Sequence, residues 1–225
     1  MSEFHIELES GTAVRLPTAG KYCDRDILVS AGDEGYHLGL AEGEQAAYDR
    51  FWDDFQQKGK RQHYAYAFAY AGWSEASFHP QYPIAPVNPN GIANMFTWNA
   101  SITDTKVPIT AFGSCQNAFN NATNLKRIPK LIFSGATNVS NMFLNCGRLE
   151  ELYCEGEITL SMSLAQSTKL TKVSIESIIN ALSATASGQT LTLSATAVTN
   201  AFGSATAEEW TSLIGGKSNW TISLV

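Results

Sequence analysis

Phenylalanine and leucine recur along the second half of the chain at a nearly constant spacing. Phe96, Phe119, Phe143 and Leu164 are separated by 23, 24 and 21 residues. Six residues after each of them comes another apolar residue: Ile102, Leu125, Leu149 and Leu170. Positions nine and eleven residues on are mostly apolar too, with Thr105 and Lys130 as exceptions. Self-similarity at a fixed period is typical of repeat architectures, so we expect this region to consist of stacked units.

Each unit is too small to fold alone. Asn94, Asn117 and Asn141 precede the apolar residues of the first three units, where an Asn can cap a short helical turn before a brief strand. Such units must stack to bury their apolar faces, which predicts a mixed α/β (α+β) leucine-rich-repeat solenoid with short strands and short helices. The residues expected to point into its core are Phe119, Leu125, Ile128, Phe143, Leu149, Leu152, Leu170 and Val173.

The C-terminal part keeps the order of helix followed by strand. Ile175, Ile178, Ile179 and Leu182 have helical spacing within residues 174–183, and Thr190 to Leu193 alternate between polar and apolar. A helix at 207–214 and a strand at 220–224 are expected to repeat this order. Trp210 and Trp220 should close the open end of the core.

The first 90 residues differ from the repeats. Alternating apolar residues at 4–8, 13–16 and 26–30 predict a small β-module within 1–35. The amphipathic pattern of 42–58 predicts a helix that caps the first repeat, and the prolines of 79–91 recur every third residue, as in an extended polyproline connector. We therefore expect three regions: the β-module at 1–35, the capping and connecting segment at 36–90, and the repeats at 91–225.

Charge and hydropathy exclude some classes of partner. The formal net charge is −6, and the excess of acidic residues lies before residue 91. Phosphate binding usually needs a basic surface, so we expect no nucleic-acid partner. No stretch approaches the 18 apolar residues of a membrane span, and the first residues lack the pattern of a secretory signal, so we expect no membrane insertion and no signal-directed export.

The chain shows no motif of a known catalytic or metal site. Its four histidines are scattered, and phosphate-binding glycine loops and nucleophile motifs are absent from the sequence. Its four cysteines, Cys23, Cys115, Cys146 and Cys154, lack metal-binding spacing and are expected to be buried structural thiols. The sequence thus predicts a protein that is not an enzyme, with no catalytic residues, no metal site and no cofactor.

Residues 63–73 carry an aromatic ring on nearly every second position, with Ala between. On a strand this pattern places the large rings on one face. They either pack in the core against the helix at 42–58 or form an exposed shelf that binds a protein or a sugar. The candidate binding residues are Tyr64, Tyr66, Tyr70 and Trp73. The repeat Asn and Ser residues either bond to turn backbone or line a second, polar binding face.

Two segments resemble known families. Residues 141–152, with Met142, Phe143, Cys146, Leu149 and Leu152, resemble the Met-Phe-x-x-Cys-x-x-Leu-x-x-Leu unit of BspA-like leucine-rich repeat proteins. This resemblance covers roughly residues 91–176, although Asn99, Ala122 and Ser167 stand at the cysteine position of the other units. Residues 16–29 are similar to a segment of tail and baseplate-region proteins of phages and prophages from Gram-positive gut bacteria.

These resemblances imply a structural and recognition role. The N-terminal module would attach to other tail proteins of a virion, and the repeats would bind a protein or glycan on the host surface. The alternative is a BspA-like adhesion protein on a bacterial cell surface. The expected location is therefore the virion tail, after synthesis in the bacterial cytoplasm, or else the cell surface; association of identical copies is left open.

Overall fold

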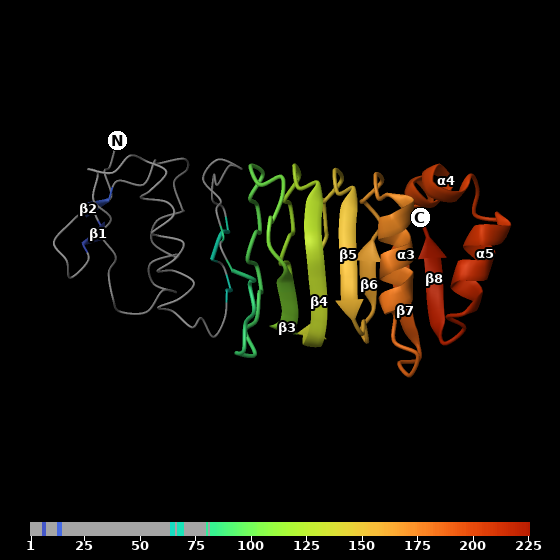
Figure 1. Ribbon diagram of the computed structural model, residues 1–225, viewed down its shortest axis with the longest axis horizontal. Helices are drawn as coiled ribbons and strands as arrows, with labels where there is room; N and C mark the ends of the chain where they lie inside the picture. Colours follow the sequence, from blue (N-terminus) through green and yellow to red (C-terminus); the bar gives the residue numbers. More distant parts are fainter. Residues whose placement is uncertain (1–5, 8–12, 15–63, 66, 70–79, 81) are drawn as a thin grey trace.

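The structure is a computed structural model that describes residues 6–7, 13–14, 64–65, 67–69, 80 and 82–225. In the described part, the elements between residues 109 and 193 lie side by side along the long axis of the molecule in chain order, and the last strand, 220–224, lies between strand 189–193 and the last helix (Figure 1). Its helices and strands form a mixed α/β structure with two parallel sheets and, near the N-terminus, one short antiparallel pair.

The first parallel sheet has the order β3-β4-β5. Its strands are β3 (Ile109–Ser114), β4 (Arg127–Asn138) and β5 (Glu151–Gly156). Ile109 pairs with Leu131, and Leu131 pairs with Cys154, so the apolar residues of successive strands lie in register on the core side. Parallel strands need a long return connection, which the turns between these strands provide.

The proline-rich segment takes part in this sheet. Ile84 is fully buried and forms a parallel bridge with Ile109 of β3. Ser114 N donates to Pro89 O at 2.7 Å, and a Cβ on Gly113, whose φ is +59°, would lie only 2.4 Å from that oxygen. The segment is therefore packed against β3, where the sequence pattern had suggested only an extended connector.

The connections between these strands contain turns in place of the short helices expected from the sequence. Asn94, Asn117 and Asn141 do not cap helices; each has a positive φ of 54–55°, in the left-handed region that Asn tolerates better than most residues. Within the first two turns every second backbone N–H donates to the next unit, as in Phe96 N to Ala118 O at 2.7 Å and Phe119 N to Met142 O at 3.0 Å. The backbone hydrogen bonds between neighbouring turns therefore follow the pattern seen between parallel strands.

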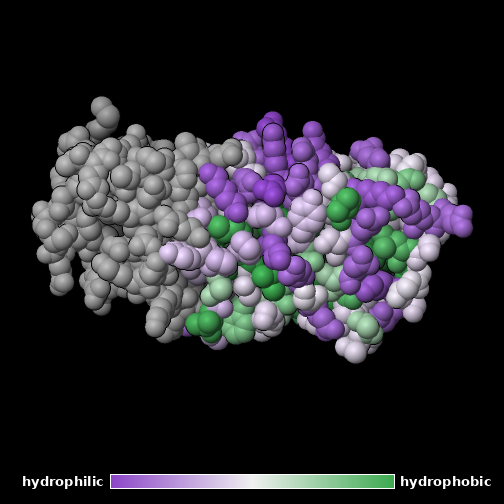
Figure 2. Space-filling view, in the orientation of Figure 1, coloured by the Kyte–Doolittle hydropathy of each residue, from purple (hydrophilic) through white to green (hydrophobic). Residues whose placement is uncertain are grey.

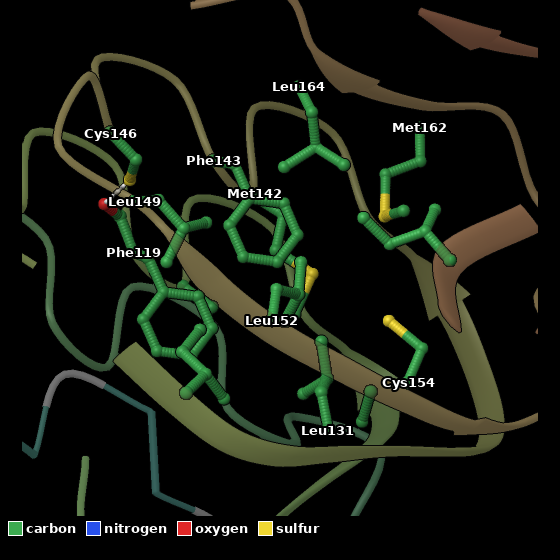
Figure 3. Close-up of a cluster of buried hydrophobic side chains, with 14 of the residues drawn as sticks. Phe119, Leu131, Met142, Phe143, Cys146, Leu149, Leu152, Cys154, Met162 and Leu164 are labelled. Atoms are coloured by element: carbon green, nitrogen blue, oxygen red, sulfur yellow. Dashed lines mark hydrogen bonds between the residues drawn. The ribbon is translucent and has the colours of Figure 1, made fainter. Parts of the chain in front are cut away.

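A row of stacked phenylalanines forms the centre of the core. The ring centroids of Phe96 and Phe119 are 5.7 Å apart, and those of Phe119 and Phe143 are 5.5 Å apart with nearly parallel planes. Phe68 extends the row, 5.0 Å from Phe96, so the repeat begins one unit earlier than the sequence indicated. Figure 3 shows Phe119 and Phe143 side by side, with Leu152 and Leu131 below Phe143.

The second parallel sheet lies toward the C-terminus, with the order β6-β7-β8. The elements of this part are β6 (Met162–Leu164), α3 (Lys172–Ala181), β7 (Gln189–Leu193), α4 (Ala195–Phe202), α5 (Glu208–Gly215) and β8 (Trp220–Leu224). The expected helices at 174–183 and 207–214 and the expected strands at 190–193 and 220–224 are confirmed to within two residues. Helix α4 was not expected, although Ser194 caps its start and Gly203 its end. Trp210 and Trp220 are buried at this end of the core, as predicted.

The N-terminal region is described at four residues only. β1 (Ile6–Glu7) pairs antiparallel with β2 (Ala13–Val14), in agreement with the first two strands of the expected β-module. The expected strand at 26–30 and the expected helix at 42–58 lie outside the described residues.

The prediction of a leucine-rich-repeat solenoid is wrong, although the mixed α/β class is right. The described residues form two small parallel sheets of three strands each and three helices, without closure into a solenoid. The physical reason lies after β5, where helix α3 occupies the position of the next strand. Its serine hydroxyls bond to the free edge of β5, so the first sheet cannot continue.

The same change explains the one wrong residue among the predicted core positions. Seven of these residues are buried: Phe119, Leu125, Ile128, Phe143, Leu149, Leu152 and Leu170. Val173 is 55% exposed, because it is the second residue of α3 and the buried face of that helix consists of Ser174, Ile175, Ile178, Ile179 and Ala181. From Lys172 on, buried side chains recur about every 3.6 residues, as in a helix, and no longer at every second residue, as in a strand.

Candidate binding surface

The three turns that stack before β3, β4 and β5 each hold two residues with positive φ, four positions apart. These pairs are Asn94 and Trp98, Asn117 and Asn121, and Asn141 and Asn145, with φ between 54° and 60°. Asn is the residue type, after Gly, that most readily adopts this conformation. Five of the six positions therefore carry the residue that the backbone favours, and Trp98 is the exception.

Side-chain amides connect neighbouring turns. Asn117 Nδ2 donates to Asn94 Oδ1 at 3.1 Å, and Asn145 Nδ2 donates to Asn121 Oδ1 at 2.7 Å. Asn121 Nδ2 in turn donates to Asn120 Oδ1 at 2.6 Å. We call these five residues the amide row. Each amide has two donor hydrogens and an oxygen that can accept two bonds, so the row keeps donors and acceptors beyond the bonds that orient it.

Trp98 lies in line with the amide row. Its backbone N–H donates to Asn120 O at 2.8 Å, Asn121 N donates to Leu144 O at 2.8 Å, and Asn145 N donates to Gln166 Oε1 at 2.6 Å. Trp98, Asn121 and Asn145 therefore occupy one column across three successive units. Parallel neighbours of this kind are about 4.8 Å apart, so the column is on the order of 10 Å long.

The conformation of Trp98 is costly for folding. A residue other than Gly, Asn or Asp loses about 1–2 kcal/mol in the left-handed region. The Trp98 residue is 56% exposed, so burial of the ring recovers only part of its hydrophobic free energy. An exposed aromatic residue held in a strained backbone conformation is typical of a functional position.

The turns themselves carry no charge. Residues 94–99, 116–123 and 138–147 contain no Asp, Glu, Lys or Arg. The ionic side chains begin after the turns, where Arg127 contacts both Asp104 at 3.1 Å and Glu151 at 3.0 Å. Its hydrogen bond to Asp104, the main cause, raises the pKa of Arg127 further above its usual value. The edge of the stack near the start of β4 and β5 is strongly hydrophilic (Figure 2).

The position that Cys146 occupies in its unit faces the carbonyl of a preceding unit. Cys146 Sγ lies 3.0 Å from Phe119 O, Asn99 Nδ2 donates to Phe68 O at 3.4 Å, and Ser167 Oγ donates to Cys146 O at 3.2 Å (Figure 3 shows the first of these). Asn99 thus bonds, like Cys146, to the carbonyl of the phenylalanine in the preceding unit, whereas Ser167 bonds to the carbonyl of Cys146 itself. At this position Cys, Asn and Ser therefore all contact a backbone carbonyl of a preceding unit, although the side chains differ.

The described cysteines are structural, as predicted. Cys115, Cys146 and Cys154 are buried and unpaired, and Cys23 lies outside the described residues. Burial raises the pKa of each of the three thiols from 9.0 to about 12. Almost no thiolate exists at neutral pH, so these groups are poor nucleophiles.

The aromatic segment is described in part. Tyr64 is only 4% exposed, and its N–H donates to Gly91 O at 2.7 Å, so it packs in the stack. Ala67, Phe68 and Ala69 form a turn in which both Ala67 and Phe68 are fully buried, unlike the alternation of a strand. The other candidate residues, Tyr66, Tyr70 and Trp73, lie outside the described residues.

The described residues hold neither a cluster of metal-ligating side chains nor a helix that could span a membrane. They contain no group of three or more His, Cys, Asp or Glu side chains that could hold a metal ion. Within the same residues, no helix is long and apolar enough to cross a membrane.

No protein family model, curated protein or solved structure matches this chain. The family resemblances of the two sequence segments therefore remain predictions.

Sequence reasoning treated the repeat Asn residues as turn formers or a polar face, and it did not single out Trp98. The signal was nevertheless present. Trp98 stands two residues after the repeat Phe, where the next two units have Asn121 and Asn145. A large aromatic residue at a position otherwise held by Asn departs from the pattern, but only the positive φ and the exposure show what that departure means.

Proposed function

We propose that this protein is a non-enzymatic recognition protein that binds its partner through the exposed side of its stacked turns. The observation that carries the proposal is Trp98, an exposed aromatic residue in a strained conformation beside a row of oriented amides. Aromatic residues of this kind contribute a large share of binding energy at protein surfaces. The amide row is already held in place, so little conformational entropy is lost when it binds.

The buried thiols support a binding role over a chemical one. Cysteine is the most nucleophilic side chain among the described residues, yet all three described thiols are enclosed in the core with pKa values of about 12. The acidic residues around Arg127, Asp104 and Glu151, are partly exposed, and each is paired with Arg127. Their arrangement fits a solvated surface.

We further propose that the protein is a component of a phage or prophage tail tip. Support comes from the sequence resemblance of residues 16–29 to tail and baseplate-region proteins and of residues 141–152 to BspA-like repeats. In this proposal the N-terminal region binds other tail proteins, and the stacked turns bind a protein or glycan of the host surface. A BspA-like adhesion protein on a bacterial surface is the alternative.

Purified phage particles and host cells test this proposal together. Mass spectrometry should find the protein in particles, and an antibody against it should label the tail in electron micrographs. The purified full-length protein, labelled with a fluorophore, should bind intact host cells. Detection on producing cells but not in particles favours the adhesion alternative. Absence from both, together with no binding to host cells, contradicts the recognition role.

A further inference from the structure

We propose that Trp98, Asn121 and Asn145 form a binding site for a neutral glycan, a proposal that rests on the recognition role proposed above. One face of a sugar ring lies on the Trp98 indole. The hydroxyl groups of the next sugars bond to the amides of Asn121 and Asn145, which follow Trp98 in the same column.

The chemistry of the column matches a polyhydroxylated ligand. A hydroxyl group both donates and accepts hydrogen bonds, and so does a side-chain amide. Asn145 Nδ2 and Asn121 Nδ2 each donate one hydrogen within the amide row, which fixes the planes of both amides and leaves a second hydrogen on each. The column therefore presents oriented polar groups beside an aromatic ring face.

The absence of charge from these turns argues for a neutral ligand. Residues 94–99, 116–123 and 138–147 contain no acidic or basic residue. Lys and Arg, the side chains that would bind an anionic wall polymer or a nucleic acid, lie outside these turns, at Lys106, Lys126, Arg127 and Arg148. A neutral sugar chain needs no such partner.

The small apolar area argues against a protein partner. Among the exposed large hydrophobic residues, Trp98 and Leu144 are those that the turns carry, and Leu144 is 38% exposed. The centre of a stable protein interface is mainly apolar and larger. A single aromatic ring suits the face of a sugar, and the neighbouring amides suit its hydroxyl groups, so this surface fits a sugar better than a protein partner.

The decisive variant is Trp98→Asn, because it gives this turn the residue that the neighbouring units already have. Asn suits the positive φ of 58°, so the melting temperature should stay the same or rise by a few degrees. Binding to purified neutral wall polysaccharide of the host, measured by titration calorimetry with the full-length chain, should weaken by about tenfold or more.

Two further variants complete the test. Asn145→Gly keeps the left-handed turn and removes one amide, so it should weaken binding without unfolding the turn. Val87→Asn replaces a side chain that is 69% exposed but lies outside the column, and it should leave the affinity unchanged. The anionic wall polymers of the same host serve as the competing ligand.

Several outcomes overturn the proposal. These are binding of the anionic fraction only, equal affinity of wild type and Trp98→Asn for the neutral fraction, or no binding to the neutral fraction. A melting temperature lowered by Trp98→Asn would show that the indole serves folding. If host cells are still bound after periodate oxidation of their sugars but not after protease treatment, the recognition role stands and the glycan is wrong. If untreated cells are not bound at all, the recognition role itself fails.

Discussion

Thr105 occupies a core position of the repeat where the next two units have Ile128 and Leu152. It is fully buried, and its Oγ has no hydrogen-bond partner among the residues that the structure describes. A buried hydroxyl without a partner costs roughly 1–3 kcal/mol. We therefore expect Thr105→Val, which has nearly the same shape, to raise the free energy of unfolding by about 1 kcal/mol or more in urea denaturation. The change in the free energy of unfolding is compared with that of Thr103→Val, at a half-buried neighbouring position. A destabilised Thr105→Val variant would show that the hydroxyl has a partner.

Leu149 shows what a regular core position contributes. It is fully buried beside Phe143 and Leu152 (Figure 3). Leu149→Ala removes buried methyl groups and leaves a cavity, so the free energy of unfolding should fall by about 2–5 kcal/mol. Val173→Ala is the matched control, because that side chain is 55% exposed and its loss should change stability by less than about 0.5 kcal/mol. Equal losses in the two variants would contradict the assignment of Leu149 to the core.

The buried thiols make stability depend on pH in the alkaline range. A thiol with a pKa of about 12 in the folded protein and 9.0 when unfolded keeps its proton on folding, so its contribution is complete below pH 9. Above pH 9 the unfolded chain releases these protons, and stability falls by about 1 kcal/mol per thiol by pH 10. Urea denaturation at pH 8 and pH 10 should show a smaller loss for the variant Cys115→Ala, Cys146→Ala, Cys154→Ala than for the wild type. A wild-type loss no larger than that of the triple variant would show that the thiols do not titrate in this way.

At the scale of elements, helix α3 determines where the first sheet ends. Leu152 N donates to Ser174 Oγ at 3.0 Å, and Ser174 Oγ donates to Glu150 O at 3.0 Å. One turn further along, Cys154 N donates to Ser177 Oγ at 2.8 Å, and that hydroxyl donates to Cys154 O at 3.2 Å. The two serines thus satisfy the backbone groups that a further strand would otherwise pair. A free strand edge would attract another chain, so this arrangement also protects the edge.

Ser174→Ala should expose the importance of this contact. The substitution leaves the buried N–H of Leu152 without its acceptor, which costs about 1–3 kcal/mol. Amide hydrogen exchange at Leu152 and Cys154 should accelerate more than exchange at Ile132 in the centre of β4. Ser212→Ala in α5 is the control, because Ser212 is an exposed helical serine and its replacement by the better helix former should not destabilise the protein. Unchanged exchange at Leu152 in Ser174→Ala would contradict the bonding role of Ser174.

At the scale of the whole molecule, the two sheets share one core. The buried residues from Tyr64 to Trp220 form a single hydrophobic cluster that passes from the phenylalanine row through α3 to the C-terminal strands. Lys217 Nζ donates to Leu182 O at 2.7 Å, and Trp220 Nε1 donates to Ser183 O at 2.9 Å, so the last segment also holds the end of α3. Because α3 also bonds to β5, these contacts connect the second sheet to the first through α3.

We therefore expect the two sheets to unfold together. Leu149→Ala, which lies beside the first sheet, should accelerate the slowest amide exchange in β4 and in β7 by similar factors, because the slowest amides exchange through global unfolding. Hydrogen exchange of the full-length chain, followed by mass spectrometry, measures both strands in one experiment. Acceleration confined to β4 would show that the sheets are separate cooperative units.

The sequence by itself determined the periodic part of this protein. The spacing of Phe96, Phe119 and Phe143 and of the leucines that follow predicted the core, because a stacked unit must place apolar residues at the same position each time. Strand alternation and helical spacing likewise predicted β7, β8, α3 and α5. The left-handed Asn positions were visible as repeated Asn residues, for which the sequence suggested helix capping, bonds to turn backbone or a polar binding face.

The tertiary structure decided where the repetition stops and which departures from it matter. Whether the residues after Leu170 form a strand or a helix depends on the neighbour they meet, and the serines of α3 fit the edge of β5; local periodicity alone could not show that. Phe68 joins the aromatic row through contacts with a residue 28 positions away, which no local pattern reveals. Trp98 is an ordinary apolar residue in the sequence. It becomes a candidate binding residue only because the backbone of its turn has a positive φ and the fold leaves its ring in solvent.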